Sequence, residues 1–299
     1  MLGPTTTDPR RAEGWVPSAR QRDRDTFRRR ESRRSVGIAL VSTVLVAGVA
    51  VLALTGSPGW SRVRASFFDP QVAWQSLPKV LEGLWLNVRV MVVCALAIVV
   101  LALLLALART MRGPVFFPLR AAATAYVDVF RGLPLILVLL LVGFGLPGLR
   151  LQGIPTSAVT LGGLALVLTY SAYVAEVFRA GIESVHPSQV AAARSLGLTH
   201  AQALRTVVLP QAVRRVVPAL LNDLVALSKD SGLISILGAI DAVRAAQIST
   251  AHYANFTPYV VAGVLFVLLT IPLTRVTDAL SRRGGWLGSQ SGLAGGTVR

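Results

Sequence analysis

Several charged and polar side chains lie inside apolar stretches of this sequence, where such groups are rare and often functional. Arg131 and Glu176 belong to two such stretches, and a third stretch, 216–238, retains a whole series of polar residues. Because lipid offers no hydrogen-bond partners, these side chains must face protein or a water-filled route. The residues that we predict to line a pathway for a polar substrate are Arg131, Glu176, Asn222, Asp223, Lys229, Asp230 and Ser231.

Each charge at this depth needs a partner. Asp128 and Arg131 are three residues apart on one helical face, so they can pair with each other. Lys229 and Asp230 are adjacent and point about 100° apart on a helix, which leaves them poorly placed to neutralise each other. Arg131 or Glu176 could supply the missing partner. A structural network and direct contact with a substrate that carries an ammonium and a carboxylate both stay open.

The long polar and charged segment 187–218 separates two apolar stretches. Ser188 can cap a short helix that contains three alanines, 191–193, and Gly197 is placed to end it in a left-handed conformation. Alanine has high helix propensity and almost no bulk, so another backbone can approach such a helix closely. The segment is therefore suited to fitting into a cleft on a soluble partner. An ordinary amphipathic connector is the competing interpretation.

A second helix should follow the glycine. Thr199 and Gln202 have the spacing of a capping box, which predicts a helix start. The residue before a proline is restricted to extended conformations, so we expect this helix to end at Pro210. The predicted product is a pair of short helices joined at a glycine elbow.

Composition identifies an integral membrane protein. The 299 residues are 53% hydrophobic and 15% charged, and the mean hydropathy is +0.61. The formal net charge of +16 would suggest nucleic acid on a soluble surface, but here the arginines cluster at the N-terminus and between apolar runs. That distribution follows the positive-inside rule, so we expect a lipid bilayer and no nucleic acid as the partner. Cys94, the single cysteine, lies in an apolar run and is expected to be a packing residue.

The sequence contains no pattern for catalysis. Its two lysines, Lys79 and Lys229, do not belong to a Gly-Lys-Ser/Thr phosphate loop. Its three histidines show no metal-ligand spacing, and no cysteine cluster accompanies them. We therefore expect no metal, no cofactor and no ATPase site in this chain, and any energy for transport must come from a partner.

Hydropathy and charge predict six membrane spans. The ranges are 36–54, 90–108, 119–146, 156–178, 216–238 and 258–274. Arginines that follow or precede these ranges place both termini and the segment 187–218 in the cytoplasm. Between the spans, residues 241–255 should form an external loop or a re-entrant piece.

The remaining segments have simpler predictions. Residues 1–35 are basic and lack apolar periodicity, so we predict a disordered cytoplasmic N-terminus. Residues 284–299 are rich in Gly and Ser and should form a flexible tail. Before the second span, an apolar face with Trp74 and Trp85 predicts a helix that lies in the membrane interface before the chain turns inward.

Three motifs resemble one known family. The spacing of alanines 191–193, Gly197 and the Val-Val-Leu-Pro run 207–210 is similar to the EAA loop of permease subunits in binding-protein-dependent ABC importers. The stretches 129–135 and 171–185 resemble the branch that imports polar amino acids. The similarity covers about 77–283, within a predicted permease domain 71–283. The family usually has Glu where this chain has Ala191, so a contact made by that carboxylate is not carried over.

The resemblance implies an all-α bundle of about six transmembrane helices in a bacterial-type cytoplasmic membrane. It also implies an ATPase dimer in the cytoplasm that binds ATP and Mg, an external amino-acid-binding protein, and a second permease subunit, identical or related. By resemblance, the residues that couple to the ATPase are Gln189, Ala191, Ala192, Ala193, Ser195, Leu196, Gly197, Leu209 and Pro210.

A different class of transporter is the main alternative. In an ion- or proton-coupled secondary transporter, Glu176, Asp223 and Asp230 would carry ions or protons. Such transporters usually show an internal repeat of spans and have no need of a small-residue cytoplasmic hairpin. The sequence shows no clear repeat, which favours the importer permease. A membrane scaffold or channel subunit is a third class.

Overall fold

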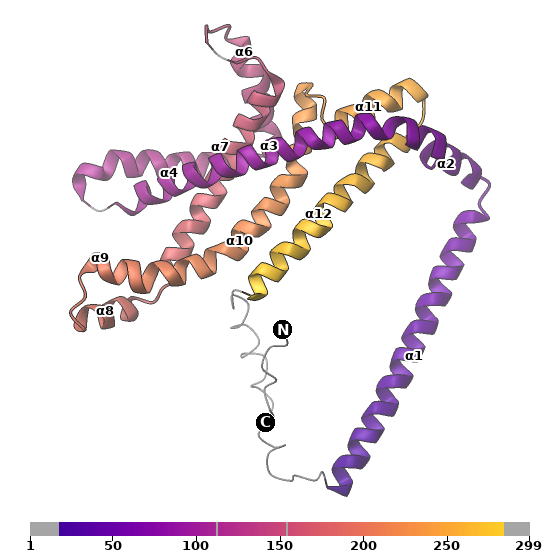
Figure 1. Cartoon of the computed structure of the whole chain (residues 1–299), viewed down its shortest axis with the longest axis horizontal. Helices are drawn as coiled ribbons and strands as arrows, with labels where there is room; N and C mark the ends of the chain where they lie inside the picture. The colour runs from indigo at the N-terminus through magenta and orange to yellow at the C-terminus, as the bar shows by residue number, and fades with distance from the viewer. Residues whose placement is uncertain (1–17, 112, 154, 284–299) are drawn as a thin grey trace. The chain divides into compact units, whose positions relative to one another are not determined.

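The computed structural model describes residues 18–111, 113–153 and 155–283, and the chain divides into two compact units, Met1–Arg64 and Ala65–Arg299. The first unit contains α1 (Ala19–Thr55) and the start of α2 (Trp60–Phe67). The helices that begin in the second unit are α3 (Pro70–Thr110), α4 (Phe117–Gly132), α5 (Leu135–Leu140), α6 (Leu146–Gly148), α7 (Ala158–Glu183), α8 (Pro187–Ser195), α9 (His200–Ala203), α10 (Leu209–Asp230), α11 (Ala242–Tyr253) and α12 (Thr257–Arg283). The described residues contain no strand, as the all-α prediction requires (Figure 1).

Helix α1 begins well before the predicted first span. The described helix starts at Ala19, so the prediction of disorder is wrong for residues 19–35, while residues 1–17 and the predicted tail 284–299 lie outside the described residues. Arg, Gln and Glu are good helix formers. Once the apolar part has nucleated a helix, each further residue only extends it. The apolar part, Ser35–Ala53, has no buried residue, which suits a surface surrounded by lipid.

Helix α3 joins what the sequence predicted as an interfacial helix and a separate span. It starts where the Asp69 side chain accepts hydrogen bonds from the backbone N–H groups of Gln71 and Val72, at 2.9 and 3.2 Å. It then continues through Pro78 for 41 residues, about 60 Å. The predicted turn is wrong because residues 84–110 contain neither Gly nor Pro to end the helix.

The two tryptophans of α3 face outward. Trp74 and Trp85 are 77% and 61% exposed, so neither tryptophan enters the core of this chain. The buried side of α3 is a narrow stripe at helical spacing, and its members are Ser76, Val80, Gly83, Asn87, Val90, Met91, Cys94, Ile98, Ala102 and Ala106. Both halves of α3 therefore use one continuous face for packing.

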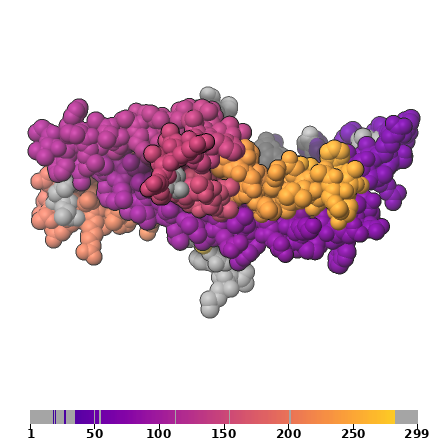
Figure 2. Space-filling view, turned by 90° about the horizontal axis from the view of Figure 1, so that it is seen from above, coloured from indigo at the N-terminus to yellow at the C-terminus, as the bar shows by residue number. Residues whose placement is uncertain are grey.

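A buried polar junction holds α3 against α11. The Asn87 side-chain amide donates to Asp241 Oδ2 at 3.0 Å, and Asn87 Oδ1 accepts from the Ala242 backbone N–H at 3.1 Å. Asn87 and Asp241 are 1% and 0% exposed. The close approach requires Gly83, because a Cβ there would lie 2.4 Å from the Asp241 carbonyl carbon. The space-filling view shows α11, in orange, lying along α3 (Figure 2).

The predicted third span is broken. Helix α4 ends at Gly132, and the helical segment that starts with α5 is bent from it by 107°. Leu133 has an extended backbone, with φ of −88° and ψ of 135°, because it precedes Pro134. A π-helical turn, Leu141–Gly145, then connects α5 to α6. The predicted third span, 119–146, is therefore a bent pair of helical segments rather than one continuous helix.

Helix α7 is the central element and confirms the fourth predicted span. It packs against α3, α4 and α10, and its most apolar window is 56% buried. Leu166 and Ala172 on α7 are fully buried together with Ile234. The core of the second unit therefore lies around α7 (Figure 1).

The predicted fifth span is not one α-helix, because its helix type changes after Asp230. Helix α10 ends there, a 3-10 helix covers Ser231–Leu237, and Gly238 follows with a φ of +92°. The next segment, predicted as a loop or re-entrant piece, is the helix α11, bent by 52° from the preceding one. Helix α12 then covers and extends the sixth predicted span. By length and composition, the described residues contain four helices able to cross a membrane, or up to six if each bent pair is one span.

Candidate coupling loop and pathway residues

The first helix of the predicted hairpin is α8, and its cap differs from the prediction. His186 occupies the N-cap position, where its Nδ1 accepts from the Ser188 backbone N–H at 3.2 Å. Pro187 takes the first helical position, whose missing N–H would be unpaired in any case. The prediction that Ser188 is the cap is therefore wrong by two residues.

The glycine elbow is confirmed. Gly197 has a φ of +85°, and the backbone N–H groups of Gly197 and Leu198 donate to the carbonyls of Arg194 and Ala193 at 3.0 and 3.3 Å. These two hydrogen bonds satisfy carbonyls at the end of α8. Because a left-handed backbone strains residues with a Cβ, glycine is the residue that fits here.

The capping box is also confirmed. The Thr199 backbone N–H donates to Gln202 Oε1 at 2.8 Å, and the Gln202 backbone N–H donates to Thr199 Oγ1 at 3.3 Å. The predicted helix end at Pro210 is wrong, because helical structure continues from α9 into α10 through a π-helical turn, Leu204–Val208. Pro210 lies in the first turn of α10. The π turn shifts the hydrogen-bond ladder at the point where proline has no N–H to contribute.

The segment from α8 to the start of α10, here called the coupling loop, presents a small exposed surface. Ala193, Ala203 and Val208 pack inward, at 5%, 0% and 6% exposure, whereas Leu196 at the elbow is 85% exposed. The other predicted coupling residues are exposed, and they are Gln189, Ala191, Ala192, Ser195, Gly197, Leu209 and Pro210. The loop lies at the end of α10 far from α11 (Figure 1).

Two contacts hold the coupling loop against the first turns of α10. The Gln211 side-chain amide on α10 donates to Gln189 Oε1 on α8 at 2.5 Å. Arg215 on α10 donates through Nη1 to the Ser184 carbonyl at the end of α7. Both contacts cross between α10 and the α7–α8 side of the loop, so the loop is positioned as one piece with α10.

The predicted pathway residues separate into two groups. At the end of α7, Glu176 accepts from Arg109 Nη1 at 2.8 Å and from Arg179 Nε at 3.1 Å. Arg131 Nη1 lies 3.9 Å from the same carboxylate. The predicted Asp128–Arg131 pair is therefore wrong, since Arg131 lies beside Glu176 instead. The same cluster of opposite charges includes Glu183 paired with Arg179.

The second group lies along α10. Asp230 Oδ2 accepts from the Tyr170 hydroxyl at 2.7 Å. The expectation that Arg131 or Glu176 supplies a partner for Lys229 or Asp230 is therefore wrong, because both lie in the Glu176 cluster. Asn222 and Lys229 are exposed, while Ser231 is buried and donates to the Ser228 carbonyl at 2.9 Å. The expected single lining is thus not assembled within one chain.

Asp223 is the unusual member of this second group. Its Oδ2 atom is buried and has no hydrogen-bond partner within the described part of the chain. The residue lines a cavity of about 240 Å³ together with Tyr170, between α3, α7 and α10. A buried carboxylate oxygen without a donor is costly, so this cavity is the place where a donor from a ligand or a partner would contribute most.

Sequence reasoning missed the tyrosines. Besides Tyr170, the Tyr126 hydroxyl donates to the Leu168 carbonyl at 2.9 Å and lies 2.9 Å from Ser171 Oγ, which ties α4 to α7. The available signal was a tyrosine inside an apolar span, because its hydroxyl must find a partner there.

Comparison with known proteins places this geometry among transport proteins. The family described as binding-protein-dependent transport system inner membrane component matches residues 98–284. The chain is 35% identical over 208 residues to the arginine transport system permease protein ArtQ of Bacillus subtilis, with 69% of this chain and 93% of that protein covered. It is 39% identical over 176 residues to the probable glutamine ABC transporter permease protein GlnM of the same organism, covering 58% and 79%.

Solved structures agree with this fold. A crystal structure of an amino acid ABC transporter with histidines has 35% sequence identity and a TM-score of 0.67, and the match covers 72% of this chain and 98% of that one. An inward-facing structure of the MetNI methionine ABC transporter, at 19% identity and a TM-score of 0.57, shares the fold over 73% and 99%.

Proposed function

This chain belongs to the family of inner membrane components of binding-protein-dependent transport systems, and from that premise we propose that it is the permease subunit of an ATP-driven importer of polar amino acids. Its relatives include permeases named for arginine, glutamine and glutamate transport. Membership in this family favours the importer over the ion-coupled secondary transporter. The family and the apolar helices make it a multi-pass membrane protein.

The coupling loop is the observation that carries the proposal. It is an exposed elbow of small residues with one apolar side chain, Leu196, at its tip. Such a surface fits a cleft on a soluble ATPase, and Ala191 and Ala192 let the partner backbone approach closely. ATP and Mg then bind to that ATPase dimer, and this chain contributes no cofactor site. Energy reaches the membrane through α10, which continues directly from the loop.

The remaining partners follow from the same proposal. An external binding protein delivers the amino acid, and a second permease subunit, identical or related, completes the route. Asp223 and Asp230 on α10 are the carboxylates that we place beside that route. The termini and the coupling loop face the cytoplasm of a bacterial-type cell.

Reconstitution tests the proposal. The chain is co-expressed with candidate ATPase and binding-protein subunits, purified and placed in proteoliposomes. Uptake of labelled arginine, glutamine and glutamate is then measured with and without ATP. We expect uptake of at least one of them that requires both ATP and the binding protein. Uptake that follows an ion gradient and ignores ATP would instead support the secondary transporter.

Topology can be tested on the same chain. The native chain has one cysteine, Cys94, which is buried, so an introduced cysteine gives a clean labelling signal. Leu196→Cys on the coupling loop should react with an impermeant thiol reagent only in inverted vesicles. Leu151→Cys, an exposed site in the turn after α6, should react only in right-side-out vesicles. Labelling from the reverse sides would contradict the proposed orientation.

A further inference from the structure

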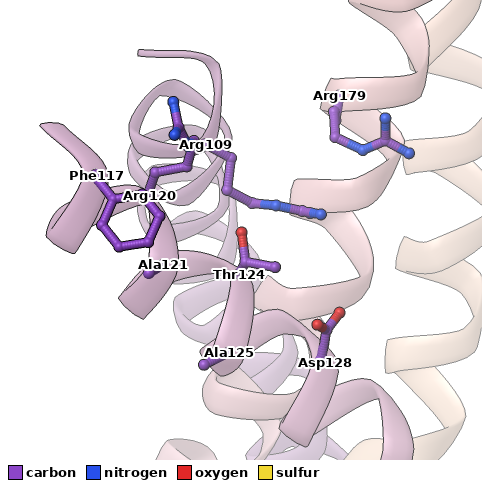
Figure 3. Close-up of a pocket in the computed structure, with 8 residues that line it drawn as sticks. All are labelled: Arg109, Phe117, Arg120, Ala121, Thr124, Ala125, Asp128 and Arg179. Atoms are coloured by element: carbon purple, nitrogen blue, oxygen red, sulfur yellow. The ribbon is translucent and has the colours of Figure 1, made fainter. Parts of the chain in front are cut away.

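A pocket of about 530 Å³ opens between α3, α4 and α7. Its walls carry three arginines, Arg109, Arg120 and Arg179, together with Phe117, Thr124 and Asp128. Figure 3 shows Phe117 and Arg120 on one side, Arg179 on the other, and Arg109 and Thr124 between them. The proposed function uses none of this surface.

The arginines of the pocket are not equally engaged. Arg109 and Arg179 share the Glu176 carboxylate. Arg120 has no ion pair among the described residues, and its Nη1 makes one contact of 3.3 Å to the Met111 carbonyl. Its guanidinium lies 5.8 Å from the centre of the Phe117 ring. Each guanidinium has five N–H donors, so Arg109 and Arg120 retain donors for an additional anion.

The remaining charge limits where an anion can lie. Asp128 is exposed at the other end of the pocket and repels negative groups. It follows Arg120 by two helical turns, about 12 Å along the axis of α4. The favourable position is therefore the end of the pocket near Arg109 and Arg120, where the Thr124 hydroxyl can add a hydrogen bond.

This end of the pocket lies where apolar helix surface meets charge. The apolar run of α3 finishes at Arg109, and the exposed side chains around the turn into α4 include Leu107, Val115 and Phe117, at 48%, 84% and 59% exposure. A membrane brings its hydrocarbon and its headgroups together at such a level. A ligand that combines an anionic group with a long apolar body, and that arrives from the side, matches both surfaces.

We propose that this pocket binds the phosphate of an anionic phospholipid in the leaflet on the coupling-loop side, with Arg109 and Arg120 as its donors. Basic pockets between transmembrane helices recognise lipid headgroups by this chemistry. The acyl chains lie along the exposed apolar surface beside Phe117.

The test measures lipid retention by the full chain in complex with its ATPase. The complex is placed in nanodiscs of phosphatidylcholine with a minor fraction of phosphatidylglycerol, released, and examined by native mass spectrometry. Arg120→Gln should retain about fivefold less phosphatidylglycerol, the factor that corresponds to about 1 kcal/mol for one arginine near an anionic surface. Arg120→Lys keeps the charge and should retain most of the lipid. Arg150→Gln, an exposed arginine after α6, is the matched control and should behave as wild type.

Several outcomes would overturn the proposal. Unchanged retention in Arg120→Gln would exclude the pocket, and equal loss in Arg150→Gln would indicate diffuse attraction to the whole surface. Displacement of the lipid by inorganic phosphate would assign the pocket to free phosphate. If Arg120→Gln does not fold, titration of wild-type chain with spin-labelled lipids decides, and equal binding of phosphatidylglycerol and phosphatidylcholine would contradict the site. This readout does not depend on amino-acid uptake, so it stands apart from the proposed function.

Discussion

At the residue scale, the carboxylates of α10 are the groups with the clearest chemical consequence. Asp223 and Asp230 are seven residues apart, so they lie on one face two turns from each other. Asp230 accepts a hydrogen bond from the Tyr170 hydroxyl. No Lys or Arg of the described chain forms an ion pair with either carboxylate. A negative face of this kind is complementary to the ammonium group that every amino acid carries.

Asp223→Asn removes the charge and keeps the volume of the side chain. If the carboxylate contacts the substrate ammonium, its loss costs about 1.5–3 kcal/mol, the range for hydrogen bonds to charged groups, so uptake should fall roughly tenfold or more. ATP-dependent uptake by the reconstituted complex is the measurement. Glu82→Gln, the same change at an exposed carboxylate on α3 outside the predicted pathway, serves as the control and should transport normally. Wild-type affinity and rate in Asp223→Asn would remove this residue from the pathway.

Tyr170→Phe removes the donor to Asp230 without changing packing. The partly buried Asp230 carboxylate then has no hydrogen-bond donor. The unfolding free energy should therefore fall by about 1–3 kcal/mol. For a domain of this size, each kcal/mol corresponds to about 2–4 °C in melting temperature, which thermal unfolding in detergent can detect. Tyr173→Phe is the comparison, because the Tyr173 hydroxyl makes an exposed 3.3 Å bond to the Arg131 carbonyl and should matter little. Equal shifts in both variants would argue against a special role for Tyr170.

At the element scale, the sequence predicted where helices exist better than how they connect. The glycine elbow and the capping box depend on local chemistry, so Gly197 and Thr199 could be interpreted from spacing alone. The prediction was wrong at two prolines. A helix end was predicted at Pro210, but the helix continues past it. A span was predicted through Pro134, but the helix ends just before it. A π turn lets the helix continue in the first case, and no local pattern indicates it. In the second case the extended backbone of Leu133 before Pro134 follows the local rule for residues that precede proline.

Buried partners were equally beyond sequence reasoning. Asn87 and Asp241 are 154 positions apart, and nothing in the local sequence of either one indicates the other. The candidate pathway was identified by residue type, but the partners of Glu176 and Asp230 were not, because those contacts depend on how α7 packs between α3 and α10. Helix packing, rather than helix formation, sets the functional geometry here.

Gly83→Ala tests the packing of α3 against α11. The added Cβ would meet backbone atoms of Asp241, which cannot move aside as a flexible side chain can. We expect a loss of about 1–3 kcal/mol in unfolding free energy, the usual range for overpacking. Gly263→Ala within α12 meets nothing within 4 Å and should be neutral or stabilising by up to about 1 kcal/mol. Equal melting temperatures for Gly83→Ala and Gly263→Ala would contradict the close approach of the α3 and α11 backbones at Gly83.

Ala192→Arg tests the coupling loop without disturbing its own packing. Ala192 is exposed, so the larger side chain can be accommodated in the isolated chain but should block docking into a partner cleft. We expect normal membrane insertion together with a loss of both uptake and substrate-stimulated ATP hydrolysis, about tenfold or more. Ala192→Ser stays small and should keep both activities. Normal ATPase stimulation in Ala192→Arg would remove the loop from the coupling mechanism.

At the scale of the whole molecule, the second unit leaves a route incomplete. Its predicted pathway carboxylates lie on two central helices, α7 and α10, and the apolar window of α12 is only 11% buried. We infer that one chain of this size lines one side of a route and exposes broad apolar faces. Lipid covers part of that surface, and a second permease subunit would complete the polar face.

The last prediction concerns this stoichiometry. We expect the purified complex to contain two permease chains, because a carboxylate such as Asp223 is better shielded from lipid when a second subunit faces it. Native mass spectrometry should show a permease mass of about twice 31.7 kDa if the subunits are identical, or this chain plus one related chain otherwise. Co-expression of two differently tagged copies distinguishes these cases, since only a homodimer carries both tags through sequential purification. A transport-competent complex with a single permease chain would overturn the prediction, and its Asp223 cavity would then have to close within one subunit.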